Sequence, residues 1–177
     1  MEDKDLFMPV LDNGEEILKT YRPNKLRAWF TSILSMVFIF FCFVVTFISL
    51  LINSINDLAA SMAVFLILIP YVAIISIFIK LWLNKTVYAV TTKRIIIRTG
   101  YIGVDYKSLD YTMLGALTVN VSWIDKLLHK NTGSIAFGSM ASPMTNQAVA
   151  KFTFSFIKDP YNTYKEIKQI IDAHKDK

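Results

Sequence analysis

Two long stretches without charged residues dominate the hydrophobic pattern of this chain. Residues 28–56 and 58–79 contain no Asp, Glu, Lys or Arg, and only the polar stretch 53–57 separates their apolar parts. Each stretch exceeds the roughly 20 residues that a helix needs to cross a bilayer. Apolar side chains lie on every side of these helices rather than on one face, which is typical of helices surrounded by lipid. We therefore predict a transmembrane hairpin within residues 28–83, with spans at about 29–52 and 58–80.

Two other interpretations of these stretches are less favoured. Two buried helices of a soluble bundle would show a polar face, and an apolar content of 54% with a mean hydropathy of +0.42 is high for a soluble domain of this size. The apolar core of a cleaved signal sequence spans about 7–15 residues and ends at small residues. The first stretch instead continues through the bulky Phe47, Ile48 and Leu51, and a second stretch follows.

Basic residues predict the orientation of the hairpin. Lys and Arg near the ends of a span are retained on the cytoplasmic side, and both outer flanks carry them whereas residues 53–57 have none. Trp29 and Trp82 lie where amphipathic rings favour the headgroup level. We therefore expect a multi-pass protein of the cell membrane with both termini in the cytoplasm. The expected membrane-interface anchors are Arg22, Lys25, Arg27, Trp29, Lys80, Trp82 and Lys85.

The interior of both predicted spans lacks ionisable side chains. Transporters and proton pumps usually keep such groups at membrane depth, because the function depends on them despite their cost in lipid. The lone Cys42 lies in the first span, so the chain has no disulfide. We interpret the hairpin as an anchor. A small transport or channel subunit is an alternative that only the spans motivate.

Beyond residue 84 the pattern changes to the alternation of β-strands. Val87–Thr91 and Arg94–Thr99 are rich in β-branched and aromatic residues, and the two residues between them suit a tight hairpin. Further strands are predicted at residues 104–107, 116–122, 133–138 and 151–157. The last of these would place three Phe side chains on one face. We interpret residues 123–130 as a helical turn plus loop, and residues 139–148 as a loop or a poor hairpin.

The C-terminal segment is predicted to form an amphipathic helix that covers one side of the sheet. Asp159 suits the N-cap and Pro160 the first helical position. The apolar stripe behind them is formed by Tyr164, Ile167, Ile171 and His174. The predicted fold class is therefore α+β, with a cytoplasmic segment 1–27, the transmembrane hairpin 28–83, and a β-barrel or sandwich over residues 86–175 that ends in a capping helix.

Three short motifs follow one another in the β region. They are Tyr88–Ile95 with Gly100 after the next strand, Asp125–Leu128 ahead of Gly133–Ile135, and Phe156–Tyr161 before the final helix. Their order resembles that of bacterial PH-like (pleckstrin-homology-like) domains found behind transmembrane hairpins, over most of residues 86–172. The resemblance implies a seven-stranded PH-like fold with a C-terminal helix, and it implies no settled activity.

The second motif departs from the family pattern. The family commonly has Asp-Arg-Leu-Leu-Gly there, whereas this chain has Lys126 in place of the Arg and His129 in place of the Gly. This difference argues against carrying over a binding role for that loop.

Side chains for catalysis or metal binding are scarce. The chain has two His and one Cys, and the Cys lies in a predicted span, so neither a Cys–His pair nor a zinc site can be assembled. Asp105, Asp110 and Asp125 fall near turns, where carboxylates usually cap or pair locally. We therefore expect no enzyme activity, no cofactor and no small-molecule substrate.

The net charge of +5 comes from the residues after 86, since residues 1–27 are near neutral. Each Lys or Arg close to an anionic leaflet gains about 1 kcal/mol. The candidate contacts to lipid or to a partner are Lys93, Arg94, Arg98, Lys126 and Lys130. Nucleic acid is not an expected partner, because no basic stripe with interleaved aromatic residues is present.

The preferred hypothesis is a membrane-anchored PH-like binding or scaffold module that engages another membrane protein or a second copy of itself. The main alternative is a sensor of anionic lipid headgroups at the inner leaflet.

Overall fold

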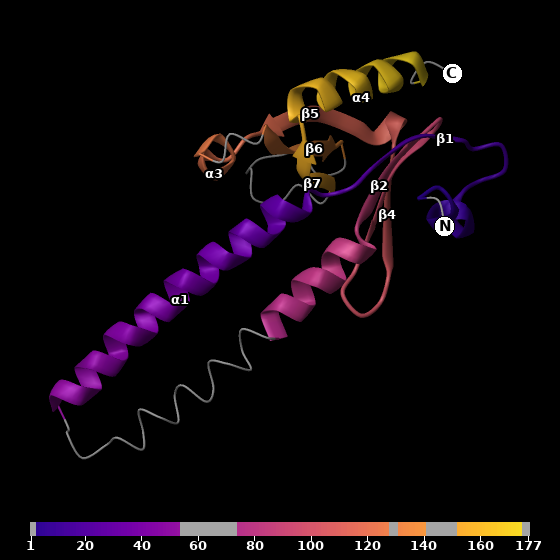
Figure 1. Cartoon of the computed structure of the whole chain (residues 1–177). Coiled ribbons are helices and arrows are strands. Elements are labelled where there is room, and N and C mark those ends of the chain that lie inside the picture. The colour runs from indigo at the N-terminus through magenta and orange to yellow at the C-terminus, as the bar shows by residue number, and fades with distance from the viewer. Residues whose placement is uncertain (1–2, 54–73, 128–130, 141–151, 175–177) are drawn as a thin grey trace.

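The computed structural model describes residues 3–53, 74–127, 131–140 and 152–174. The described strands form a four-stranded antiparallel sheet in the order β1-β2-β3-β4 and a three-stranded antiparallel sheet in the order β5-β6-β7 (Figure 1). The strands are β1 (Ile17–Tyr21), β2 (Val87–Thr91), β3 (Arg94–Thr99), β4 (Asp105–Asp110), β5 (Leu114–Asn120), β6 (Thr132–Ser139) and β7 (Phe152–Lys158). The helices are α1 (Lys25–Asn53), α3 (Trp123–Leu127), α4 (Pro160–His174), the short η1 (Asp5–Val10) and η2 (Tyr111–Met113), and a helix over residues 74–85 that we call the pre-β2 helix. The architecture is therefore α+β.

The four-stranded sheet takes strands from both sides of the long apolar segment. β1 pairs with β2, so that Tyr21 lies opposite Tyr88 and Thr20 opposite Ala89. β1 precedes α1, whereas β2 follows the pre-β2 helix with only one residue between them. Sequence alone places residues 1–27 outside the β domain, and the structure adds part of that segment to it. A five-residue strand of mixed burial is too short a pattern to be found by alternation.

The residues before β1 cover the outer face of this sheet. Phe7 of η1 is fully buried against Val87, Ala89 and Ile96. The opposite face of β2 contributes Tyr88 and other side chains to the main core. β2 is therefore buried at all five positions, because both of its faces are covered.

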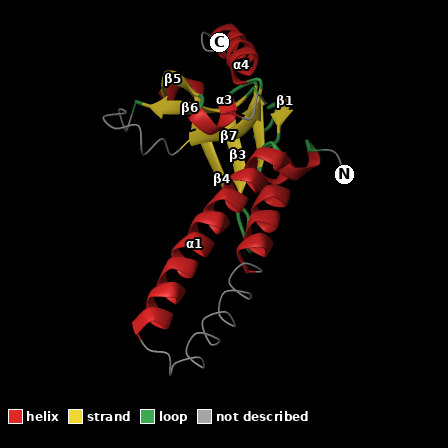
Figure 2. Cartoon of the chain, turned by 60° about the vertical axis from the view of Figure 1, so that its left-hand side comes forward, coloured by secondary structure: helices red, strands yellow, loops and turns green. Residues whose placement is uncertain are grey.

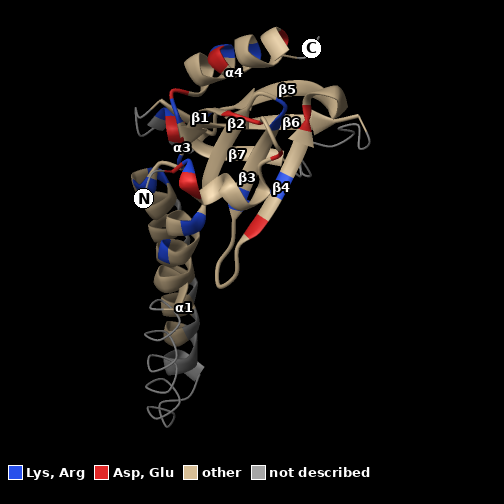
Figure 3. Cartoon of the chain, turned by 90° about the vertical axis from the view of Figure 1, so that its right-hand side faces the viewer, with Lys and Arg blue, Asp and Glu red and all other residues tan. Residues whose placement is uncertain are grey.

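The main core lies between the two sheets. The rings of Tyr88 and Phe154 are stacked with centroids 4.5 Å apart, and Phe137 packs edge-on against Phe154 at 4.7 Å. α4 closes this core with Ile167 and Ile171, which are 0% and 3% exposed. The predicted start of α4 at Pro160 and its apolar stripe are confirmed. α4 lies at the end of the domain opposite to α1 (Figures 1 and 3).

β7 departs from the predicted alternation at Phe156. The register between β6 and β7 shifts between Gly133 and Ile135, and Phe156 has a φ of 58°. A bulge of this kind changes which side chains face inward. Ile157 therefore enters the core, where it is 2% exposed, and Phe156 does not. The prediction that three Phe share one face is wrong for Phe156.

α1 leaves the domain beside the pre-β2 helix (Figure 2). Within the described residues, one helix segment is long and apolar enough to cross a membrane, namely Lys25–Val45. Its most apolar stretch has a mean hydropathy of 2.4, and only 14% of that stretch is buried in the protein. Most of the second predicted span, residues 58–80, lies outside the described residues. The same holds for residues 141–148 of the predicted loop.

Gly133→Ala tests the close fit of β6 against the start of α4. A Cβ at Gly133 would lie 2.9 Å from the carbonyl oxygen of Asn120 and 2.9 Å from Cγ of Pro160. Such overpacking costs about 1–3 kcal/mol, and we expect the free energy of unfolding of the detergent-solubilised chain to fall by this amount. Gly115→Ala is the matched control, because its Cβ would meet no atom closer than 3.4 Å. Identical denaturant transitions for the two variants, followed by near-ultraviolet circular dichroism, would contradict the expected strain.

Candidate functional site

Both helices meet the β domain at one place, which we call the junction. The side chain of Asn24 accepts hydrogen bonds from the backbone N–H groups of Leu26 and Arg27 at 3.0 and 3.3 Å, which caps the start of α1. The backbone N–H of Asn24 donates to the carbonyl oxygen of Phe156 at 2.7 Å. The first turn of α1 is therefore capped and tied to β7 by the same residue.

A buried ion pair between Arg27 and Asp125 lies at the junction. Both side chains are 4% exposed, and the guanidinium donates through Nε and Nη2 to the two carboxylate oxygens. Asp125 also accepts hydrogen bonds from the hydroxyl of Thr132 and from the backbone N–H of Ser122. The guanidinium lies over the ring of Phe156, 5.3 Å from its centroid. These contacts tie the first turn of α1 to α3, β6 and β7.

The surroundings of Asp125 favour its charged form. Burial raises the pKa of a carboxyl group. The hydrogen bonds from Arg27 and Thr132 and the positive charge of Arg27 outweigh burial, so that the pKa of Asp125 lies below its ordinary value of 3.8. Both carboxylate oxygens accept hydrogen bonds from groups within the chain, which makes the pair structural rather than a site for ligand chemistry.

Three of the expected membrane-interface anchors make contacts inside the protein. Arg27 was expected at the lipid headgroups, and its burial against a carboxylate corrects this expectation. The ring of Trp82 packs edge-on against that of Phe156, with 6.0 Å between centroids. Lys85 donates hydrogen bonds from Nζ to backbone carbonyl oxygens of the β3–β4 connection. These partners are distant in sequence, so the flanking position of the three residues gave no sign of them.

The other expected anchors remain at the surface or partly so. Arg22 forms an ion pair with Asp3, with 2.5 Å between Nη2 and Oδ1. Lys25 and Lys80 are exposed and Trp29 is half-buried. Their role at a membrane stays a prediction.

A cavity of about 380 Å³ lies between the two helices at the junction. Ala28 and Ser32 line it from α1, Phe78 and Trp82 from the pre-β2 helix, and Phe156 from β7. None of the described residues that line the cavity carries a charge. It can hold an apolar group, and it offers no chemistry for a reaction.

A second cavity of about 670 Å³, which we call the distal groove, lies at the other end of the domain. Its lining residues are Gly14, Glu16, Thr92, Lys93, Asp110, Tyr111, Thr112 and His174. β2 starts at the junction and carries the chain about 17 Å away from it, because a strand rises by about 3.3 Å per residue. Charges of both signs and several hydroxyl groups meet in the groove, which suits the polar surface of another polypeptide.

Arg94 holds the N-terminal loop beside the distal groove. Its Nε and Nη2 donate to the two carboxylate oxygens of Glu15 at 3.1 and 2.8 Å, and Nη2 also donates to the carbonyl oxygen of Val10. The buried Glu15 accepts a further hydrogen bond from the hydroxyl of Thr91 at 2.6 Å. Burial raises the pKa of Glu15, but the hydrogen bonds from Arg94, the backbone N–H of Asp12 and Thr91 lower it to below the ordinary 4.5. Arg94 is therefore a structural residue.

The structure does not bring the described candidate contact residues together at one site. Lys93 is exposed at the rim of the distal groove, next to the engaged Arg94. Arg98 lies at the junction end of β3, where Nη1 donates to the carbonyl oxygen of the last residue of the pre-β2 helix at 2.8 Å. Lys126 is exposed on α3, and Lys130 lies outside the described residues. The four described residues thus do not form one basic surface.

Metal-binding clusters are not found in the part of the chain that the structure describes, where no three His, Cys, Asp or Glu residues lie close enough to hold an ion. His174 packs at the end of α4 with Nδ1 2.8 Å from the carbonyl oxygen of Ile170. His129 lies outside the described residues. The absence of enzyme activity and of a cofactor stays a prediction.

Comparison with protein families identifies the β domain. The family model described as "Bacterial PH domain" matches residues 33–168, which is more than half of the chain. The chain belongs to the bacterial PH domain family. The predicted resemblance is therefore confirmed, and two packed sheets closed by α4 agree with the fold that it implied. Searches among curated proteins and among solved structures find no match.

Two features of the junction in this PH domain escaped the sequence reasoning. Asp125 was recognised in a motif and assigned to local capping, which its bond to Ser122 confirms, but its partner Arg27 is 98 residues away. Phe156 faces the helices because of a bulge, for which the alternating pattern of β7 gives no signal. The sequence shows Arg27 directly before the uncharged run 28–56, but nothing in the sequence pattern connects it with Asp125.

Asp125→Asn tests the ion pair of the PH domain. The amide keeps the size of the carboxyl group but leaves the buried Arg27 charge uncompensated, and breaking a buried pair in this way costs about 3–5 kcal/mol. Asp3→Asn is the matched control, because it breaks the pair with Arg22, whose side chains are 42% and 30% exposed, and should cost less than about 1 kcal/mol. Denaturant unfolding of the full chain in detergent measures both. Similar losses for the two variants would exclude a special role of Arg27–Asp125.

The stability of the PH domain should fall in acid. The pKa values of Asp125 and Glu15 are lower in the folded chain than their ordinary values of 3.8 and 4.5, so both carboxylates stabilise the fold above those values. This contribution is lost as the pH falls through the lower folded pKa values. Urea unfolding from about pH 7 to about pH 3 should show the loss, and Asp125→Asn combined with Glu15→Gln should flatten it. A wild-type stability that stays constant down to pH 3 would be the opposite result.

Proposed function

We propose that this PH domain is a membrane-anchored binding module on the cytoplasmic face, that it is not an enzyme, and that it engages another membrane protein or a second copy of itself. The observation that carries the proposal is the pairing of β1 with β2 across the apolar segment. The distal groove, which lies far from the helices, is where we expect the partner to bind.

The β1–β2 pairing supports a membrane hairpin rather than a single span. Both strands belong to one sheet, so the chain that leaves the sheet after Tyr21 must return to the same side before Val87. If α1 crosses a bilayer, a second crossing must therefore follow. Residues 58–79 are uncharged and long enough to provide it.

The surface of α1 supports contact with lipid. Val37 and Phe41 are 58% and 63% exposed, and other apolar side chains along the helix are exposed to a similar degree. Such a surface is unfavourable in water and favourable in a bilayer. In Figure 3 the Lys and Arg positions of α1, coloured blue, lie at the end of the helix next to the β domain. By the positive-inside rule, this end and the β domain face the cytoplasm.

The distal groove is the surface that we assign to the partner. The capped start of α1 and the Arg27–Asp125 pair hold the domain in one orientation to the helices, which directs the groove away from the bilayer. Glu16, Asp110 and Lys93 offer charges of both signs at its rim. A protein surface with complementary charges suits this arrangement better than an anionic headgroup does.

The lipid-sensor alternative has less support from the geometry. Lys93 lies at the end of β2 that points away from the helices, and Arg94 is bound to Glu15. Arg98 lies at the junction end of its strand and bonds to the backbone there, which leaves Lys126 of α3 as the exposed described candidate beside the junction. No observation on the described residues favours a transport or channel subunit.

Photo-crosslinking in intact cells tests the proposed function. A photoreactive amino acid in place of Thr112, at the distal groove, should form an adduct with a protein, because its side chain is exposed where the partner binds. The same amino acid in place of Lys165, exposed on α4, is the control. Chain and adduct should both stay with the membranes after alkaline carbonate washing. Equal crosslinking at both positions would argue against the groove, and release of the chain by carbonate would argue against the anchor.

A further inference from the structure

The connection between β3 and β4 carries an exposed apolar tip, which we define as residues 100–104. Ile102 is 83% exposed, Tyr101 52% and Val104 39%, and the tip contains no charged residue. Turns in water usually expose polar side chains. Apolar side chains gathered at the end of a hairpin indicate contact with something other than water.

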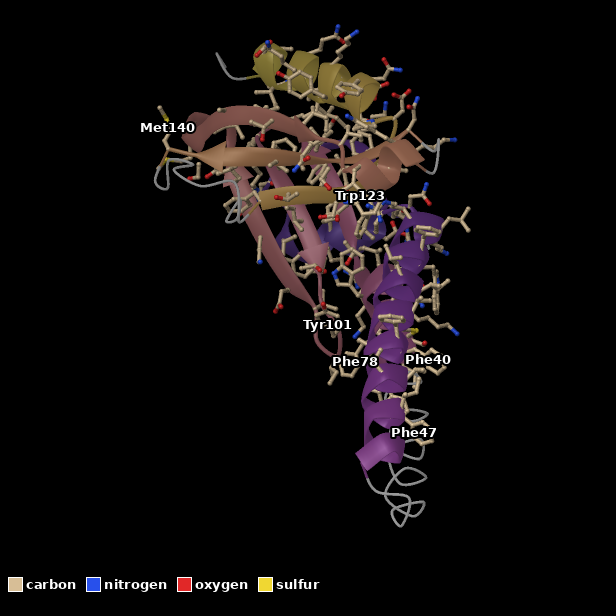
Figure 4. All side chains as sticks on the ribbon, turned by 90° about the vertical axis from the view of Figure 1, so that its left-hand side faces the viewer. Phe40, Phe47, Phe78, Tyr101, Trp123 and Met140 are labelled. Carbon is tan, nitrogen blue, oxygen red and sulfur yellow. The ribbon has the colours of Figure 1, made fainter. Side chains whose placement is uncertain are left out.

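The tip lies beside the apolar part of the pre-β2 helix. The ring of Tyr101 packs edge-on against that of Phe78, with 5.8 Å between centroids (Figure 4). Phe78 precedes the last residue of this helix, Lys85, by seven residues, which corresponds to about 10 Å along the axis. The tip therefore reaches past the basic end of the helix, to the level of its uncharged residues. Figure 4 also shows Tyr101 alongside α1, between the start of the helix and Phe40.

The polar backbone of the tip has a partner that suits a bilayer. Lys85 donates from Nζ to the carbonyl oxygens of Ile102 and Gly103, the second at 3.3 Å. A carbonyl oxygen without a hydrogen bond costs several kcal/mol in hydrocarbon. A lysine ammonium near the end of a span can supply this bond while it stays at the interface. In water the same carbonyl groups would need no such donor.

The tip is also folded tightly. Gly100 has a φ of 153°, and a Cβ at this position would lie 2.3 Å from the carbonyl oxygen of Gly103. The close approach of Gly100 and Gly103 brings Tyr101 and Ile102 to the end of the hairpin, where both side chains are exposed.

We infer that the tip inserts into the boundary between headgroups and acyl chains of the cytoplasmic leaflet, as a third membrane contact beside the two helices. Its partner is the phospholipid bilayer itself, and the recognition is apolar rather than specific for one headgroup. This inference rests on the proposed membrane anchor. Continuity with the helix surface carries it, because Tyr101 extends the apolar side of the pre-β2 helix at Phe78. Together with the two helices, a third contact at the tip would fix the tilt of the domain on the membrane.

Fluorescence quenching in liposomes tests the insertion. The full chain carries Cys42→Ser, which removes its single cysteine, together with Ile102→Cys, Phe40→Cys or Thr112→Cys, and is labelled with an environment-sensitive fluorophore. All three positions are exposed, so the label should not disturb folding. In phosphatidylcholine and phosphatidylglycerol vesicles, brominated acyl chains should quench the emission at positions 40 and 102 and leave position 112 unchanged. Aqueous iodide should give the reverse order.

The label on α1 separates failure of the inference from failure of the anchor. Quenching by brominated lipid at position 40 together with quenching by iodide at position 102 would overturn the insertion and leave the anchor standing. Quenching by iodide at both positions would overturn the anchor and the insertion with it. A third outcome is a label at position 102 that neither brominated lipid nor iodide quenches until the protein is diluted in the bilayer. If iodide then quenches it, a second copy of the chain had covered the tip, and the insertion is overturned.

Discussion

The buried pair of Arg27 and Asp125 connects the two halves of this molecule. One charge lies in the first turn of a long apolar helix and the other in a short helix of the β domain, and both are almost completely removed from water. Each charge would be costly at this place without the other. The pair therefore requires α1 and the α3 region to be present and correctly placed together. The bulge at Phe156, which puts an aromatic ring beneath the guanidinium, is part of the same arrangement.

Several basic residues that the sequence suggests as membrane anchors or as contacts to lipid or a partner have partners inside the chain. Arg27 and Arg94 each neutralise a buried carboxylate at opposite ends of the domain, and Arg98 binds backbone at the junction. Lys93 and Lys126, which are exposed, remain available to a partner. The basic net charge of the chain is thus a poor guide to its binding surface. The local surfaces distinguish the two ends of the domain better: the β3–β4 hairpin has an uncharged apolar tip at one end, and the distal groove at the other end carries charges of both signs.

The elements that could be predicted from sequence are those whose signals are local. β2, β3 and α4 have the predicted bounds, because β-branched runs around a two-residue turn and a proline at the first helical position act over neighbouring residues. β1 could not be found, since five residues of mixed burial become a strand only by pairing with β2. The partners of Arg27 and Trp82 were hidden for the same reason. They depend on how distant segments fold together, and a single sequence does not display such contacts.

The pairing of β1 with β2 has a consequence for the biogenesis of the protein. β1 is synthesised first, but its partner is made only after the whole segment between Tyr21 and Val87 has left the ribosome. Contacts of such large sequence separation form slowly. During synthesis, the N-terminal strand must therefore stay without its partner strand until the returning chain emerges beside it. Completion of the sheet then traps the intervening segment as a closed loop, so that this segment cannot be withdrawn or reoriented unless the domain first unfolds.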